Sequence, residues 1–348
     1  MILGGKNIRR ISVKRSIELF LLAIFFISCK DKQEDSLIKI TGEAQGTTYS
    51  IAYLSSDGIN YKKSVDSLLR VIDTSLSTWV SSSIISRINN NDSTAQPDEH
   101  FIKVFNKAIE VSELTSGDFD ITVGPIINAW GFGFSKKEKI DSLLVDSLLK
   151  NIGYKMVRLE NNKLIKEKES IQLDFNAIAQ GYSVDVLGAL LEAEGITDYF
   201  IELGGEVIAK GHKQQGEKWK IGIDSPDENN LDERKIKAIL QLENKALATS
   251  GNYRKFYIEN GKKYSHIIDP HTGYPAKHHL LSASVIAADC MIADAFATAF
   301  MVMGTEKSKE FLANHEELGL EVYFIYDEGG KWKTYVSEGI KKQITELN

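Results

Sequence analysis

Apolar side chains recur at helical spacing in several parts of the chain. Within residues 61–76, Val65, Leu68, Leu69 and Ile72 stand at positions i, i+3, i+4 and i+7, which predicts an amphipathic helix. Further helices are expected over residues 101–114, 141–150, 177–193, 289–303 and 306–314.

Apolar and polar residues alternate over residues 38–54, the pattern of a half-buried strand, with interruptions at Gly42 and Gly46. The strands come in runs instead of alternating one by one with helices, which favours an α+β fold over a doubly wound sheet. Neither a repeat nor a linker rich in Pro, Gly or Ser divides residues 38–348, so we expect one domain there. Further strands are expected over residues 156–159, 164–165, 171–175, 199–208, 219–223, 236–242, 253–258, 281–287, 321–326 and 332–336.

The first 28 residues have the pattern of an export signal. Basic residues precede an apolar run at residues 19–27, which is about half of the ~20 residues that a membrane-spanning helix needs. Ser28 and Cys29 follow and resemble the lipid-attachment site of bacterial lipoproteins; an ordinary signal peptide with an incidental cysteine is the alternative. We expect removal of residues 1–28 and a lipidated Cys29 on a tether that reaches residue 37. The protein would then be membrane-anchored and face the periplasm or the cell exterior.

Composition narrows the class of protein without naming a chemistry. The chain has 348 residues, 43% of them apolar and 26% charged, which excludes a disordered or low-complexity protein. Its net charge of −6 is spread over mixed acidic and basic residues, so no nucleic-acid-binding footprint is present. Two cysteines exclude a disulfide framework and a zinc site built from cysteines. The sequence also lacks a P-loop, a zinc-protease helix motif and a serine-hydrolase elbow.

Asp294 stands among apolar residues of a predicted helix and is the first candidate for chemistry. Thr298 lies one turn further on the same face. An ionised carboxylate in such a helix needs a partner, because burial without one is costly. Carboxylate and hydroxyl oxygens without His or Cys are the ligands that Mg²⁺ and Ca²⁺ prefer. A metal site, and an Asp294 that is merely hydrogen-bonded to Thr298 or to a neighbouring loop, are both open at this point.

The segment 264–275 is the second candidate. Its Asp-Pro and Thr-Gly pairs mark tight turns that hold His266 and Asp269 on a short stretch. A histidine near a carboxylate can act as a general base, because the carboxylate fixes its tautomer and stabilises the cation. The alternative is an ordinary surface or core histidine.

Three further segments combine glycine or polar residues with strand and helix boundaries. Residues 174–182 place polar side chains at a strand-to-helix junction, where free backbone N–H groups can bind an anion. Gly204 and Gly205 interrupt an apolar strand, which indicates a bulge or a close backbone approach. The glycines of residues 130–134 are interpreted as a tight turn, because nothing in that segment requires phosphate.

Taken together, these segments resemble the ApbE family, the FAD:protein FMN transferases. The matching pieces follow the family's order from Gln45 to Gly304, most of the chain. One such string is weak evidence, whereas many in the same order are specific. The pieces are Gly46-Thr47-Thr48-Tyr49, Leu76-Ser77-Thr78-Trp79, Ser86-Arg87-Ile88-Asn89, residues 117–125, Trp130-Gly131-Phe132-Gly133, residues 174–182, Gly204-Gly205, Ala248-Thr249-Ser250-Gly251-Asn252-Tyr253, residues 265–273 and residues 293–299.

The resemblance implies a fold and a set of site residues. It implies an ApbE-like domain over residues 38–348, with a mixed, mostly antiparallel sheet and packed helices. It also implies Mg²⁺, held by the Asp294 carboxylate, the Thr298 hydroxyl and the backbone carbonyls of Ala177 and Ala297. The resemblance also implies that FAD is the substrate, and the indole of Trp79 is the ring expected to stack on a flat ring of FAD. The implied FAD-binding residues are Gln45, Trp79, Asp118, Phe119, Asp120, Asp174, Gln180 and Ile268.

The resemblance further implies the reaction. The FMN half of FAD passes to a Thr or Ser hydroxyl of a target flavoprotein, and AMP leaves. A hydroxyl has a pKa far above neutrality and needs a base as it attacks phosphorus, for which His266, oriented by Asp269, is the candidate. Tyr253 and Arg254 are candidates for phosphate contacts by residue type. The expected targets are subunits of exported or membrane-bound redox complexes.

The sequence departs from the family pattern at a few positions. Gln45 stands where many relatives have Met, and Gln180 stands where Lys or Glu is common, which alters how one group of FAD is held. Three alternatives remain. An FAD pyrophosphatase would use the same metal and release FMN and AMP into solution. An FAD-binding lipoprotein without turnover would need neither metal nor base, and a purely structural lipoprotein would not respond to flavin.

Overall fold

The computed structural model describes residues 1, 35–133, 138–226, 235–253, 256–259 and 262–347. The expected export signal, Cys29 and Arg254 lie outside the described residues. Among the helices of the described part, none is long and apolar enough to cross a membrane.

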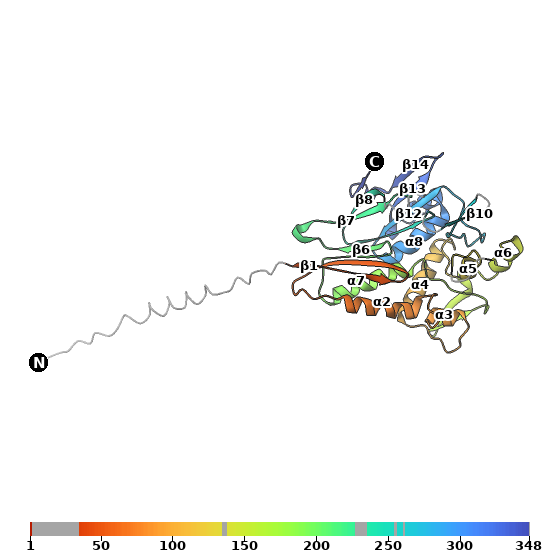
Figure 1. The fold of residues 1–348 in the computed structure, drawn as a ribbon, viewed down its shortest axis with the longest axis horizontal. Coiled ribbons are helices and arrows are strands. Elements are labelled where there is room, and N and C mark those ends of the chain that lie inside the picture. The colour runs from red at the N-terminus through yellow and green to blue at the C-terminus, as the bar shows by residue number, and fades with distance from the viewer. Residues whose placement is uncertain (2–34, 134–137, 227–234, 254–255, 260–261, 348) are drawn as a thin grey trace.

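An eight-stranded antiparallel sheet forms the centre of the protein (Figure 1). Each neighbouring pair of strands in it is antiparallel. In spatial order the strands are β1 (Ser36–Ala44), β2 (Thr47–Ser55), β5 (Tyr199–Leu203), β6 (Glu206–Lys210), β9 (Lys245–Gly251), β12 (Leu280–Ala287), β13 (Glu321–Asp327) and β14 (Trp332–Val336).

Three smaller sheets accompany it. A three-stranded sheet has the order β15 (Ile344–Glu346), β8 (Ile236–Leu242) and β7 (Trp219–Asp224). The other two small sheets are hairpins, which are separate from the eight-stranded sheet. One pairs β3 (Val157–Glu160) with β4 (Lys163–Lys166), and the other pairs β10 (Phe256–Glu259) with β11 (Lys262–Ser265). The second hairpin leads directly into the segment that carries His266.

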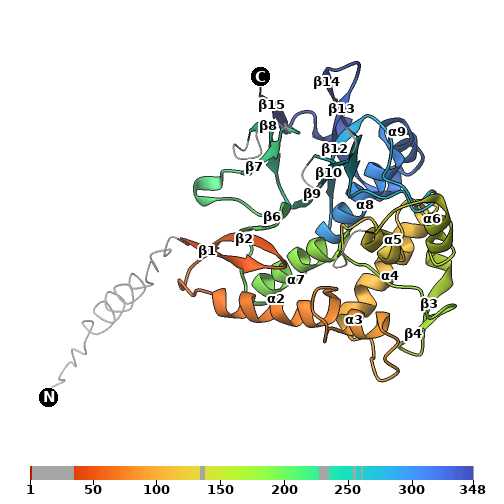
Figure 2. The same ribbon diagram turned by 45° about the vertical axis from the view of Figure 1, so that its right-hand side comes forward.

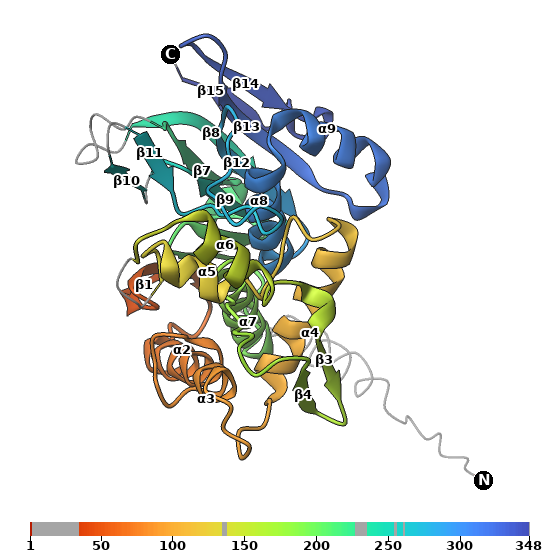
Figure 3. The same ribbon diagram turned by 90° about the vertical axis from the view of Figure 1, so that its right-hand side faces the viewer.

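Helices cover one face of the large sheet (Figure 2). α7 packs on β5 and β6, α8 packs on β9 and β12, and α2 packs on β1 and on α7. Figure 3 shows α5 and α6 in front of the sheet, above α7 in this view. The helices are α2 (Lys62–Leu76), α3 (Ile84–Asn89), α4 (Glu99–Leu114), α5 (Gly124–Ala129), α6 (Ser142–Leu149), α7 (Ala179–Ala193), α8 (Cys290–Met303) and α9 (Thr305–Asn314), with 3-10 turns at Tyr154–Met156, Gln214–Gly216, Glu316–Leu318 and Glu338–Ile340.

The two faces of the sheet bury separate apolar clusters. On the helix side, Val285 of β12 packs in one cluster with Phe296 and Phe300 of α8. On the other side, Ile286 of β12 packs in one cluster with Leu240 of the three-stranded sheet. Successive residues of a strand face opposite sides, so β12, with both faces covered, is apolar apart from the buried Ser282 and Ser284.

The α+β prediction, with a mostly antiparallel sheet, is confirmed. The six predicted helices form, with ends that differ by at most two residues. The segments predicted as single strands over residues 38–54 and 199–208 are each a hairpin. Gln45 (φ 53°) and Gly46 (φ 72°) make the turn of the first, and Gly204 with Gly205 makes the turn of the second.

The strand predicted over residues 171–175 does not form, although Ile171, Leu173 and Phe175 are buried in the alternation that is typical of a strand. The backbone of Leu173 bonds to the side-chain amide of Asn89, which donates to its carbonyl (2.8 Å) and accepts from its N–H (2.7 Å). A side chain therefore takes the place of a neighbouring strand. β9 was missed in the prediction, because its small residues give a weak strand pattern.

Candidate active site

The first turn of α7 lies against α8 and holds the predicted metal-binding carboxylate. The N–H of Gly181, the third residue of α7, donates to Oδ2 of Asp294 at 3.0 Å. Asp294 is only 6% exposed, so its carboxylate lies in the interior. Of the two interpretations that the sequence left open, a bond to a neighbouring segment is present. It uses one lone-pair position of a group that has about four, so it leaves room for a metal ion.

Glycine at position 181 allows this contact. A Cβ atom there would lie 2.4 Å from the carbonyl oxygen of Cys290 and 2.8 Å from Cβ of Asp294. Real Cβ atoms do not approach other atoms so closely, so any side chain at this position would push the two helices apart. At this junction the backbone of α7 at Gly181 therefore packs directly against α8.

The oxygen atoms around this junction fit Mg²⁺. Gly181 is the third residue of α7, so its N–H has no partner within the helix, and it donates to Asp294. Ala177 precedes the N-cap residue Ile178, so its carbonyl lies outside the helical hydrogen bonds of α7. Ala297 lies within α8, where its carbonyl accepts from the helix and only a second lone pair is open. Among the described residues no group of three or more His, Cys, Asp or Glu could hold a metal ion, so a site here depends on carbonyl and hydroxyl oxygens.

Thr298 lies one turn after Asp294, as its spacing predicts, and its hydroxyl has a partner on the sheet. Oγ1 of Thr298 and Oγ of Ser250 on β9 are 3.1 Å apart. If Thr298 donates its proton to Ser250, its lone pairs are available to a cation. Ser250 thus belongs to the site although sequence reasoning assigned it no role.

Burial raises the pKa of Asp294 to about 7; the N–H of Gly181 opposes the rise, and the neighbouring carboxylate of Asp185 adds to it. Burial also raises the pKa of Asp185 to about 7, against the N–H groups of Met291 and Cys290, which lower it. Two carboxylates that are costly to ionise lie at the same junction. A divalent cation beside Asp294 would favour its charged form.

Gln45 and Gln180, both predicted to bind FAD, lie around the start of α7. Nε2 of Gln45 donates to Oγ of Ser183 on α7 at 2.8 Å. A Cβ at Gly204 would lie 2.9 Å from Cγ2 of Thr47 and 3.0 Å from Nε2 of Gln180. The β1–β2 turn, the β5–β6 turn and the start of α7 therefore meet at one place. Of the bulge and the close approach that the sequence left open at Gly204, the structure has a close approach, by side chains to the backbone of a hairpin turn.

Asp118 and Asp120 have different surroundings although they are two residues apart. Oδ1 of Asp118 lies 3.1 Å from Nε2 of His271, and burial raises its pKa against the effect of this histidine. Both oxygens of Asp120 accept bonds within the protein, Oδ1 from the N–H and hydroxyl of Thr122 and Oδ2 from the N–H of Tyr154. Asp118 is therefore available to a ligand beside His271, whereas Asp120 shapes the loop.

Asp174 lies three residues before Ala177 and is tied to the segment of Asp118. Its N–H donates to the carbonyl of Ile121, and its Oδ1 accepts from the N–H of Asn176 at 2.7 Å. Burial raises the pKa of Asp174. The structure thus brings Asp174 next to the turn that carries the predicted carbonyl ligand.

The three apolar or aromatic members of the predicted FAD set differ in exposure. Phe119 (2% exposed) and Ile268 (5%) belong to apolar clusters, so their side chains pack the interior. Trp79 is 65% exposed in the link between α2 and α3. An exposed indole is available for stacking on a flat ring.

His266 and Asp269 lie on one loop that is held from several sides. Asp269 accepts from the N–H of His271 (2.8 Å) and from the hydroxyl of Thr272 (2.9 Å), so both of its oxygens stabilise the turn. The ring of His266 lies edge-on to Phe132, with centroids 6.3 Å apart. Asp269 therefore fixes the loop that carries His266, which is a different role from a direct bond to the imidazole.

Trp130, in the turn after α5, contacts the loop that carries His266. Nε1 of Trp130 donates to the carbonyl of Gly273 at 2.9 Å, and the indole contacts the rings of Tyr264 and Tyr274. Gly131 has a φ of 80°, which agrees with the tight turn predicted there. This turn positions the histidine loop.

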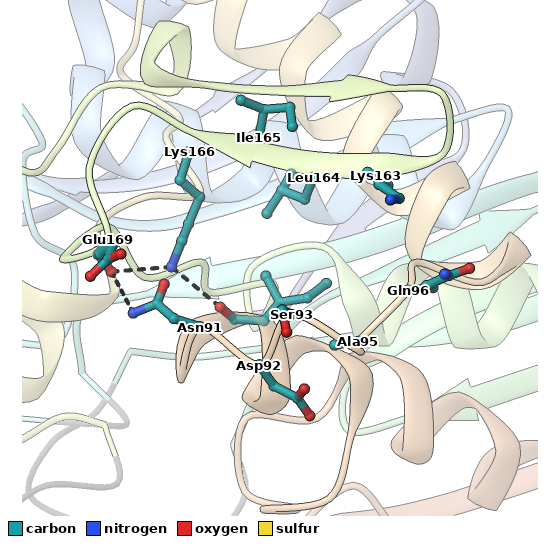
Figure 4. A pocket seen from close by; sticks show the side chains of 11 residues that line it. Asn91, Asp92, Ser93, Ala95, Gln96, Lys163, Leu164, Ile165, Lys166 and Glu169 are labelled. Atoms are coloured by element: carbon teal, nitrogen blue, oxygen red, sulfur yellow. Dashed lines mark hydrogen bonds between the residues drawn. The ribbon is translucent and has the colours of Figure 1, made fainter.

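A cavity of about 340 Å³ lies elsewhere, between the α3–α4 connection and the β3–β4 hairpin (Figure 4). Lys166 reaches into this region and donates to the carbonyls of Ile88, Glu169 and Ile171 at 2.9–3.2 Å. All three of its protons are thus used to hold the backbone. None of the predicted site residues lines this cavity.

Sequence reasoning missed three residues that touch the site. Asp185 bonds to the start of α8, Ser250 bonds to Thr298, and His271 bonds to Asp118. Asp185 had a signal, because it is an acidic residue between Val184 and Val186, four residues after Gly181. Its partner is 105 residues away in the chain, and no local pattern reveals such a distance.

Comparisons with known proteins agree on one family. The model of the ApbE family matches residues 45–324. The FAD:protein FMN transferase of Haemophilus influenzae is 34% identical over 93% of this chain and 96% of its own length. That of Vibrio cholerae is 35% identical over 89% of this chain and 93% of its own.

Solved structures give the same result. The flavin transferase ApbE from Vibrio cholerae superposes with a TM-score of 0.78 at 32% identity, covering 89% of this chain and 99% of that protein. The apo form of the flavinyl transferase ApbE from Pseudomonas stutzeri also gives a TM-score of 0.78, at 31% identity, over 89% and 97% of the two chains.

Proposed function

This chain belongs to the ApbE family, and from that premise we propose that it is an FAD:protein FMN transferase with a Mg²⁺ site at the junction of α7 and α8. FAD is the substrate, and the acceptor is a Thr or Ser hydroxyl of a target flavoprotein. The bond between the FMN phosphorus and the bridging oxygen breaks, a bond from phosphorus to the hydroxyl oxygen forms, and AMP leaves with the bridging oxygen.

The observation that carries the metal assignment is the bond from Gly181 to Asp294. It holds a buried carboxylate against the first turn of α7, which directly follows the segment of Ala177, and the carbonyl of Ala177 lies outside the helical bonds of α7. The residues proposed to hold the ion are Asp294, Thr298, Ala177 and Ala297. When bound there, Mg²⁺ neutralises charge on phosphate oxygens, which is the main requirement of phosphoryl transfer.

The protein's own side chains supply the remaining functions. Nε2 or Nδ1 of His266 accepts the proton of the attacking hydroxyl, while Asp269 holds the loop in place through His271 and Thr272. Asp118, Asp174, Gln45 and Gln180 offer polar atoms to FAD around the start of α7, and the exposed indole of Trp79 offers a stacking surface. Phe119, Asp120 and Ile268 support these residues from within the fold.

The test uses the purified protein with FAD, Mg²⁺ and a threonine-containing acceptor domain from a covalent-FMN protein. Mass spectrometry of the acceptor and chromatography of the nucleotides are read together. An acceptor heavier by one FMN, with equal AMP and no free FMN, supports the transferase. Free FMN and AMP beside an unmodified acceptor support the pyrophosphatase instead, and intact FAD in all reactions contradicts both.

Asp294→Ala provides the metal control in the same assay. The variant is expected to lose Mg²⁺-dependent activity, because the carboxylate is the only charged ligand in the proposed set. Asp289→Ala is the matched control, since this exposed residue precedes the same helix and makes no side-chain bond to its start. Undiminished activity of Asp294→Ala at limiting Mg²⁺ contradicts the proposed ligands.

We also propose that the protein is an exported lipoprotein, anchored through Cys29. The basic residues, the short apolar run and the Ser28–Cys29 pair support this. Its targets would then be exported or membrane-bound redox subunits. Metabolic labelling with a fatty acid tests the anchor: the wild type is expected to be labelled and Cys29→Ser is not, while the purified variant keeps its catalytic activity.

A further inference from the structure

α7 and α8 each donate backbone N–H groups from their first turn to a carboxylate of the other helix. Oδ1 and Oδ2 of Asp185 on α7 accept from the N–H groups of Cys290 and Met291, both at 2.8 Å. Oδ2 of Asp294 on α8 accepts from Gly181 at 3.0 Å. On α7, the N–H donor Gly181 and the acceptor Asp185 are four residues apart. On α8, the N–H donor Cys290 and the acceptor Asp294 are also four residues apart. The same face of each helix therefore serves both contacts.

Neither helix is capped by its own preceding residue. Ile178 precedes α7 and has no side chain that could accept a bond, and Asp289 precedes α8 without making a side-chain cap. The first N–H groups of a helix have no partner within it and must find one elsewhere. Here each helix supplies the partner for the other. The position of α8 relative to α7 thus depends on these carboxylates.

The contact also leaves little freedom. At Gly181 the two helices are so close that a Cβ atom would lie 2.4 Å from the carbonyl oxygen of Cys290. Asp185, one helical turn after Gly181 on α7, accepts hydrogen bonds from the same first turn of α8. Two points of attachment, at Gly181 and at Asp185, fix both the distance and the rotation of α8. Rotation of α8 decides where Asp294 and Thr298 point.

We propose that Asp185 is a positioning residue, which sets α8 so that Asp294 and Thr298 face the carbonyl of Ala177. Asp185 does not touch the metal ion; it acts through the backbone of Cys290 and Met291. This inference rests on the proposed function, because the metal site is part of that proposal. Groups that orient metal ligands typically change metal affinity by about 10–100-fold when they are altered.

The test compares Asp185→Asn with the wild type and with Asp289→Asn as the matched control. An amide oxygen can still accept one of the two bonds, so the variant keeps part of the contact but loses the second acceptor and the charge. We expect the Mg²⁺ concentration for half-maximal FAD cleavage to rise about 10-fold or more, while kcat at saturating Mg²⁺ stays near that of the wild type. Asp289→Asn is expected to leave both values unchanged.

Calorimetric titration with Mg²⁺ and the rise in Tm that Mg²⁺ produces provide readouts besides activity. A lower Tm in Asp185→Asn with unchanged Mg²⁺ affinity would show a purely structural cap and overturn the inference. Asp185→Glu is the second variant, since it keeps both oxygens but moves them by one methylene. If Asp185→Asn does not fold, the Glu variant decides: weaker Mg²⁺ binding supports positioning, and unchanged binding overturns it.

The two proposals fail in different ways. A wild type that binds Mg²⁺ but neither cleaves FAD nor modifies an acceptor contradicts the proposed function. The calorimetric comparison of wild type and variants still decides the role of Asp185 in that case. A wild type that does not bind Mg²⁺ overturns both.

Discussion

The backbone N–H of Gly181 and the carboxylate of Asp294 are joined by a 3.0 Å hydrogen bond, although 113 residues separate them in the chain. This bond places the carboxylate beside the start of α7 and gives a partner to an N–H group that has none within its own helix. One predicted metal ligand, Asp294, is thereby held at Gly181, which lies four residues along the chain from another, Ala177. The contact depends on a residue without a side chain.

Gly181→Ala tests that dependence. The added methyl group would meet the carbonyl of Cys290, so the helices must separate. Overpacking of this kind costs about 1–3 kcal/mol, which denaturant unfolding measures. We expect this loss of stability together with weaker Mg²⁺ binding. A variant as stable as the wild type, with the same Mg²⁺ dependence, would show that α7 and α8 can move apart without effect.

His266→Ala tests the proposed base. The variant is expected to bind FAD as the wild type does, while transfer falls about 10²–10⁴-fold, the usual contribution of a general base. FAD binding by fluorescence and transfer by mass spectrometry are measured side by side. His279→Ala, at an exposed histidine of the same region, is the control. Loss of FAD binding in His266→Ala would place His266 in the substrate pocket and the base elsewhere.

Ser250→Ala tests the partner of Thr298. Without the Ser250 hydroxyl, 3.1 Å away, the Thr298 hydroxyl loses the group that orients it. Loss of a neutral hydrogen bond costs about 1 kcal/mol, so the Mg²⁺ requirement is expected to rise several-fold. Thr249→Val is the matched control, because the neighbouring Thr249 bonds to Ser284 and not to Thr298. An equal change in both variants would assign the effect to the strand and not to the metal site.

The buried ring of His278 is expected to make the free energy of unfolding depend on pH. Its Nε2 donates to the carbonyl of Met301 in the last turn of α8, and its Nδ1 accepts from the N–H of Leu280, so the ring is neutral. Burial lowers the pKa of His278 below 6.5, against the bond to Met301, which raises it, and nearby His279 lowers it further.

Because the folded pKa is lowered, the contribution of His278 is fully present above about pH 6.5 and is lost as the pH falls towards the folded pKa. His278→Asn is expected to flatten the decline in stability between about pH 7 and pH 5, as measured by denaturant unfolding at each pH. His279→Asn removes only the smaller effect of this exposed neighbour and is expected to leave most of the decline in place. Parallel curves for His278→Asn and the wild type would contradict the assignment.

Much of the fold could be predicted from local patterns. The apolar spacing of Val65, Leu69 and Ile72 is a property of one segment, and those residues are fully buried or nearly so on α2. Hairpins were harder, because the turn at Gln45 and Gly46 is only two residues long, and the interruption at Gly46 alone did not separate a turn from an irregular strand. Over residues 171–175, by contrast, a strand was predicted that does not form. Their alternation is real, but the backbone partner of Leu173 is the side chain of Asn89.

The sequence by itself determined which chemical groups this protein has and in which segments they stand. Asp294 and Thr298 share a helical face because they are four residues apart, and the ordered motifs identified the family. Only the tertiary structure decided which groups meet. Asp289 directly precedes α8 and has the residue type of a cap, yet α8 is held by Asp185 of another helix. Periodicity is set by the local backbone, whereas the partner of a buried donor is set by helix packing, which joins residues far apart in the chain.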